Sequence, residues 1–109
     1  MKIYISGPIT ALPIEEAKKI FKNKACELEE FGFTVVNPME LPHIHSGEWI
    51  DYMREDITAL MQCDAIYLLP KWFNSKGAVI EAQLASRLGF IMWEEGKAEI
   101  NELLKMKKI

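Results

Sequence analysis

The stretch Asn74-Ser75-Lys76-Gly77-Ala78-Val79-Ile80-Glu81-Ala82 follows the apolar run Ala65-Ile66-Tyr67-Leu68-Leu69. This arrangement predicts a buried strand, a turn, and a helix that continues to Leu88. Ser75 can cap this helix, and Gly77 allows a ligand to approach the backbone closely. Because backbone N–H groups and the helix dipole converge at the start of a helix, we interpret Ser75 and Gly77 as a candidate anion site.

One face of this predicted helix carries small residues and a single acid. Positions i, i+3, i+4 and i+7, which share a helix face, hold three alanines and one carboxylate: Ala78, Glu81, Ala82 and Ala85. Glu81 is therefore either a functional carboxylate near the helix start or a solvent-facing side chain at the edge of the stripe. The sequence leaves both alternatives open.

Strand-like and helix-like segments alternate along the whole chain. Strands are expected at 2–6, 33–36, 65–69 and 90–93, and helices at 14–31, 49–62, 75–88 and 98–106. The order predicts a single α/β domain over residues 1–109, with a doubly wound, flavodoxin- or Rossmann-like parallel sheet of four to five strands and helices on both faces. Ligands bind beyond the carboxyl ends of such strands, which here are Ser6-Gly7, Asn37-Pro38 and Pro70 to Ser75.

Composition excludes several classes of protein. Half of the 109 residues are hydrophobic, but no apolar run approaches the roughly 18 residues that span a membrane. Met1-Lys2 leads directly into a predicted strand rather than a signal peptide, so we expect a cytoplasmic protein with no membrane partner. The net charge is −3, and the sequence shows no basic patch of the kind that binds nucleic acid. The lysines at 105, 107 and 108 are expected to complement the C-terminus of the last predicted helix instead.

The cysteines and histidines give little indication of a metal or a cofactor. Cys26 and Cys63 are far apart and form no CxxC motif, so we expect reduced, buried thiols. His43 and His45 are two residues apart in the proline-containing loop 39–47, and such a pair on a loop favours a surface loop or a lid over a metal pair. No GxGxxG motif is present, and we expect neither a metal nor a cofactor.

Asp56 lies in the predicted helix 49–62, whose apolar side holds Trp49, Met53, Ile57, Leu60 and Met61. One helical turn separates Asp56 from Met53 on one side and from Leu60 on the other, which places it at the border of the buried stripe. From its position alone, Asp56 is expected to form a salt bridge with Arg54 or another neighbour.

Taken together, Tyr4 with Ser6-Gly7-Pro8, Asp56, and Ser75-x-Gly77-x-x-x-Glu81 resemble the nucleoside 2-deoxyribosyltransferase family and its relatives that hydrolyse nucleotide N-glycosidic bonds. The resemblance covers residues 1 to about 89 and is greatest to a short branch of that superfamily. It implies an enzyme that cleaves or transfers the N-glycosidic bond of a nucleoside or its 5′-monophosphate through a glycosyl-enzyme intermediate.

The resemblance also implies roles for individual residues. Glu81 would be the nucleophile, Asp56 the acid that protonates the leaving base, and Tyr4 the hydroxyl that orients Glu81. Ser75 and Gly77, with Ser6 and Gly7 on the same edge of the sheet, would hold the sugar 5′ end or its phosphate. This chemistry requires carboxyls in opposite protonation states, so we expect Asp56 to be protonated by desolvation and Glu81 to be ionised near the helix start.

Two expectations concern partners and alternatives. Related enzymes share sites between subunits, and Trp72-Phe73 and Trp49 are strongly apolar, so we expect a homodimer or a higher homo-oligomer. In the transferases a polar residue near the C-terminus completes a neighbouring site, for which Asn101 is the candidate here. The alternative function is a catalytically silent nucleotide-binding module; a response-regulator domain is excluded because Ser6-Gly7-Pro8 and Pro70 occupy the places of its acids.

Overall fold

The structure is a computed structural model and describes residues 1–9, 12–42 and 47–96. The elements are β1 (Lys2–Ser6), α1 (Ile14–Glu30), β2 (Thr34–Val36), the 3-10 helix η1 (Pro38–Glu40), α2 (Trp49–Leu60), β3 (Ala65–Leu68), the 3-10 helix η2 (Trp72–Asn74), α3 (Lys76–Arg87) and β4 (Ile91–Glu94). Strands and helices alternate as predicted. The helix expected at 98–106, the lysines after it and Asn101 lie outside the described residues.

The strands form one parallel sheet of four strands in the order β2-β1-β3-β4. In β1, Tyr4 lies opposite Val36 of β2 on one side and opposite Ile66 of β3 on the other. This topology confirms the predicted flavodoxin-like α/β fold. The chain passes from β1 to β2 in one direction and then returns to β3 in the other, so the strand order reverses between β1 and β3. Ligands of doubly wound sheets bind at the carboxyl ends of the strands beside this reversal.

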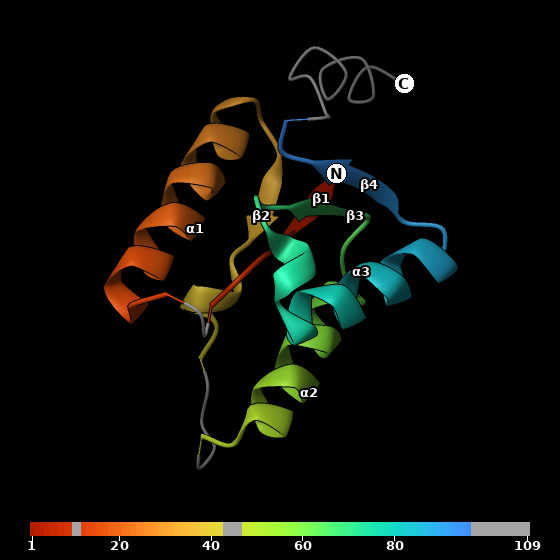
Figure 1. Cartoon of the computed structure of the whole chain (residues 1–109). Helices are drawn as coiled ribbons and strands as arrows, with labels where there is room; N and C mark the ends of the chain where they lie inside the picture. Colours follow the sequence, from red (N-terminus) through yellow and green to blue (C-terminus); the bar gives the residue numbers. More distant parts are fainter. Residues whose placement is uncertain (10–11, 43–46, 97–109) are drawn as a thin grey trace.

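Helices cover both faces of the sheet (Figure 1), with α1 on one side and α2 and α3 on the other. Successive side chains of β1 alternate between these faces. Ile3 and Ile5 pack in the core beneath α1, whereas Tyr4 and Ser6 point toward α2 and α3. The α1 core also contains Phe21, Ala25, Leu28, Phe33, Tyr67 and Trp93, and the opposite core contains Leu60, Cys63, Ile66, Leu68, Ala82 and Ala85.

The helix boundaries follow local signals in the sequence. Gly32 adopts a φ of 89°, a left-handed conformation that favours glycine and ends α1. The Ser75 hydroxyl accepts a hydrogen bond from the Ala78 N–H at 3.3 Å, which confirms the predicted cap of α3. The observed elements begin and end within two residues of the predicted ones, the usual uncertainty at frayed ends.

The apolar side of α2 differs from the prediction at both ends of the helix. Trp49 and Met61 are 40% and 42% exposed rather than buried in the core. Met61 lies past the last helical residue, and Trp49 is the first residue of the helix, where it lines a cavity instead of packing on the sheet. Asp56, expected at the border, is instead buried at 7% exposure.

Both cysteines of the chain are free thiols. Cys63 is free and buried, as predicted, whereas Cys26 is free but exposed on the outer side of α1. Among the described residues, none of the helices is both long enough and apolar enough to cross a membrane.

Candidate active site

A cavity of about 410 Å³ lies at the carboxyl end of the sheet, beside the reversal of strand order. Small-molecule sites in proteins have volumes of about 300–1,000 Å³, and they favour this position in doubly wound sheets. The walls of the cavity come from the end of β1, the faces of α2 and α3, the start of α1, and η1. The lining residues are Tyr4, Ser6, Gly7, Ile9, Ile14, Lys18, Phe21, Pro38, Met39, Trp49, Tyr52, Met53, Asp56, Ser75, Lys76, Gly77, Ala78 and Glu81.

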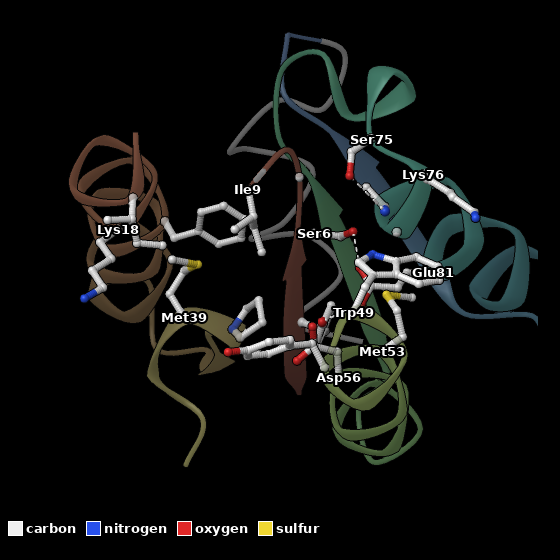
Figure 2. Close-up of a pocket in the computed structure, with 18 residues that line it drawn as sticks. Ser6, Ile9, Lys18, Met39, Trp49, Met53, Asp56, Ser75, Lys76 and Glu81 are labelled. Carbon is white, nitrogen blue, oxygen red and sulfur yellow. Dashed lines mark hydrogen bonds between the residues drawn. The ribbon is translucent and has the colours of Figure 1, made fainter. Parts of the chain in front are cut away.

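Glu81 lies at the centre of the polar wall (Figure 2). It is 5% exposed, which excludes the alternative of a solvent-facing side chain. The Tyr4 hydroxyl donates to Glu81 Oε2 at 2.7 Å, and the Ser6 hydroxyl donates to Oε1 at 2.6 Å. Alanines surround Glu81 on its helix face, so α3 packs closely on β1 and brings the carboxylate within reach of both hydroxyls.

Burial raises the pKa of Glu81 to about 7. The hydrogen bonds from Ser6 and Tyr4 lower the pKa, and the charge of Asp56 raises it. We expected an ionised Glu81 near the helix start, but it lies in the second turn of α3, where loss of solvation outweighs the helix dipole. The Glu81 carboxyl therefore exchanges its proton near neutral pH.

Tyr4 acts only as a hydrogen-bond donor to Glu81. Burial, followed by the charges of Glu81 and Asp56, raises the pKa of the Tyr4 phenol far above its ordinary value. Its hydroxyl keeps its proton at every physiological pH and cannot repel the carboxylate that it holds.

Asp56 forms a second buried carboxyl in the same cavity. It lies one helical turn after Met53 on the inward face of α2. Of the partners expected for Asp56, Arg54 instead pairs with Asp51, and its Nη1 lies 3.0 Å from Asp51 Oδ1. The structure therefore brings Tyr4, Asp56 and Glu81 together from β1, α2 and α3.

The start of α3 forms the adjoining part of the wall. Ser75 lines the cavity, and because its oxygen accepts from Ala78, its own hydroxyl hydrogen can still be donated. A Cβ on Gly77 would approach Met53 Sδ to 3.0 Å, so glycine here lets α3 pack closely against α2. Lys76 Nζ lies 4.7 Å from the centroid of the Trp49 ring, in a cation–π contact at the cavity.

Ser6 and Gly7, which we expected to hold the sugar 5′ end or its phosphate, also have contacts within the protein. The Ser6 side chain is 1% exposed and its hydroxyl is directed at Glu81. A Cβ on Gly7 would lie 2.8 Å from Leu69 Cβ, so the absence of a side chain is required for packing against the end of β3. Both residues line the cavity, but the structure gives each of them a function within the protein itself.

A family model described as "Domain of unknown function (DUF4406)" matches residues 1–93, most of the chain. The chain belongs to the DUF4406 family. The match extends from β1 into β4 and includes every cavity-lining residue. No curated protein matches the chain significantly.

Among solved structures, this DUF4406 domain is similar to the 2-deoxyribosyltransferase of the psychrotolerant bacterium Bacillus psychrosaccharolyticus. The TM-score is 0.67 and the sequence identity is 22%, over 86% of this chain and 71% of the other. This structural similarity confirms the predicted resemblance to nucleoside 2-deoxyribosyltransferases, and at this identity it concerns the fold.

Sequence analysis of this DUF4406 domain missed most of the apolar wall. Ile9, Ile14, Phe21 and Met39 line the cavity on the side of α1 and η1, with Lys18 beside them. On α2, Trp49, Tyr52 and Asp56 recur at i, i+3 and i+7, a spacing that could have identified Tyr52 as a neighbour of the acid. Of the loop interpreted as a lid, Met39 lines the cavity, whereas His43 and His45 lie outside the described residues. Within residues 1–9, 12–42 and 47–96 there is no cluster of three metal-ligating side chains.

Proposed function

We propose that this protein is an enzyme that cleaves or transfers the N-glycosidic bond of a nucleoside or its 5′-monophosphate. One observation carries the proposal: Glu81 receives a hydroxyl donor on each carboxylate oxygen and shares its cavity with a second buried carboxyl, Asp56. The similarity in fold to a 2-deoxyribosyltransferase supports the same chemistry. Two carboxyls are what a retaining glycosidic reaction requires.

In the first step, an oxygen of ionised Glu81 attacks the anomeric carbon of the sugar and forms an ester bond to it. The bond between that carbon and the base nitrogen breaks, and its electron pair moves to the base. Protonated Asp56 delivers its proton to the departing base, which leaves as a neutral molecule. Tyr4 holds Glu81 Oε2 during the attack and is not consumed.

In the second step, water or a second base attacks the same carbon and releases Glu81 as a carboxylate. Ionised Asp56 accepts the proton from the attacking molecule and returns to its starting state. Water as the attacker gives hydrolysis, and a second base gives transfer. The first step needs one proton on the pair of carboxyls, and since the charge of Asp56 raises the pKa of Glu81, a proton on Asp56 favours ionised Glu81.

The shape of the cavity supports an orientation for the substrate. In Figure 2, Ser75 and Lys76 lie on one side of Glu81, while Ile9 and Met39 lie across the cavity from it. The sugar with its 5′ end would face Ser75, where a hydroxyl, the backbone and the Lys76 ammonium favour an anion. The flat, apolar base would extend toward the α1 side, past Asp56.

The test is a panel of nucleosides and 5′-monophosphates incubated with the protein, with free base measured by chromatography. We expect base release by the unaltered protein and none by Glu81→Gln. The matched control is Glu30→Gln, which removes an exposed acid at the end of α1. The cavity is lined by the opposite end of that helix. Ligand binding without base release from any member of the panel would support the nucleotide-binding module instead and overturn the catalytic proposal.

A further inference from the structure

Each carboxylate oxygen of Glu81 accepts a hydrogen bond from a different hydroxyl of β1. Tyr4 and Ser6 are two residues apart on β1, so their side chains emerge from the same face of the strand. One hydroxyl is bonded to each oxygen of the carboxylate, at 2.7 Å and 2.6 Å. Both donors are almost completely buried. The carboxylate is thus held at two points by groups from one rigid, central strand.

Neither donor carries a charge. Tyr4 cannot ionise in this environment, and a serine hydroxyl does not ionise in proteins. The two hydroxyls stabilise the negative charge of Glu81 as neutral hydrogen-bond donors rather than as cations. Among the described residues, the other charged groups that line the cavity with Glu81 are Asp56 of α2, Lys76 of its own helix and Lys18 of α1.

We propose that Ser6 is a positioning residue, which fixes Glu81 Oε1 for attack and favours the ionised form of Glu81, rather than a ligand of the sugar or its phosphate. This inference rests on the proposed function for its catalytic meaning, but the hydrogen bond on which it depends is independent of any substrate. Ser6 would offset part of the effect of burial on Glu81. Without Ser6, burial and Asp56 would act against a single donor, Tyr4.

The size of the effect follows from the type of bond. A hydrogen bond to a charged group favours the charged form enough to shift a titration by about one to two pH units. With the Glu81 pKa at about 7, the loss of Ser6 would leave about a tenth or less of Glu81 ionised at neutral pH. A residue that only contacts substrate would not change this titration in the free protein.

The experiment is an NMR titration of protein labelled with ¹³C at the glutamate carboxyl carbons, without substrate. The Glu81 resonance is assigned by its loss in Glu81→Gln. We expect Ser6→Ala to raise the midpoint of that resonance by about one pH unit or more. Ser6→Thr, which keeps the hydroxyl, should restore the midpoint. Ser86→Ala, which removes an exposed serine from α3, the helix that carries Glu81, should leave the midpoint unchanged.

A second readout separates positioning from substrate binding. If Ser6 acts through Glu81, the acidic limb of the kcat/KM profile for base release moves upward in pH with the NMR midpoint, and activity recovers in alkaline solution. An unchanged Glu81 midpoint in Ser6→Ala, or a rise in KM that is equal at every pH, would overturn the inference. A protein that releases no base refutes the proposed function, but the NMR midpoint still decides whether Ser6 controls Glu81.

Discussion

The ionisation of Glu81 should cost the protein stability, and this cost can be measured without a substrate. Its pKa in the folded protein is about 7, against an ordinary value of 4.5, mainly because the side chain is buried. A carboxyl whose pKa is raised on folding contributes its full stability below the ordinary value and loses it as the pH rises through the folded value. The loss therefore falls between about pH 4.5 and pH 7 and is complete above that range.

The magnitude follows from the shift itself. Each pKa unit corresponds to about 1.4 kcal/mol, so the shift of Glu81 corresponds to about 3 kcal/mol of unfolding free energy lost between acid and alkaline solution. Glu81 is 5% exposed, so solvent screening reduces this value little. Glu81→Gln keeps the shape of the side chain but does not titrate. The difference in unfolding free energy, variant minus unaltered protein, should therefore increase by about 2 to 3 kcal/mol between pH 5 and pH 8, because part of the loss already occurs below pH 5.

The assay is urea denaturation of both proteins at pH 5, 6, 7 and 8, followed by circular dichroism. Taking the difference between the two proteins removes the contribution of titrating groups that do not interact with Glu81. Glu30→Gln, which removes an exposed acid at the end of α1, serves as the matched control. A Glu81→Gln difference that is constant from pH 5 to pH 8 would refute the reasoning, because it would show that folding does not raise the pKa of Glu81.

Three further predictions test other parts of the site. Asp56→Asn should slow release of ordinary bases by about 10²–10⁴-fold, while substrates whose leaving group needs no proton are affected little; equal losses on both classes would make Asp56 structural. Nucleoside 5′-monophosphates should bind about tenfold more tightly than the matching nucleosides in calorimetry, and Ser75→Ala should remove part of the difference; equal affinities would exclude a phosphate site at the start of α3. The protein should be at least a dimer in light scattering at micromolar concentration, since Phe73 is 64% exposed and Trp49 40% exposed; a monomer would contradict this expectation.

The fold could be predicted from the sequence because its signals are local. The run Ala65–Leu68 is buried along its whole length, and Gly32 and Ser75 mark helix ends through their own backbone and side-chain chemistry. Alternation of strands and helices then leaves few topologies, because parallel crossovers have one preferred hand. These constraints predict a doubly wound parallel sheet, whereas the strand order β2-β1-β3-β4 depends on long-range pairing that local signals do not encode.

The details of the site depend on long-range contacts that no local pattern encodes. Ser6 and Glu81 are 75 positions apart, so the sequence could place them on the same edge of the sheet but not in one hydrogen bond. Asp56 was expected at a helix border because its neighbours alone do not reveal that β1 and α3 enclose it. The sequence likewise did not reveal that Trp49 lines the cavity, since a tryptophan at helical spacing is more often part of a core.

A covalent sugar on Glu81 would test the central claim most directly. The protein is incubated with a 2-deoxy-2-fluoro-arabinosyl nucleoside, whose fluorine slows the second step, and is then analysed by intact mass and peptide mass spectrometry. We predict a mass increase of one fluorosugar per chain, located on the peptide that contains Glu81 and absent from Glu81→Gln. An adduct on another residue, or release of the base with no adduct on Glu81, would contradict the assignment of Glu81 as the nucleophile.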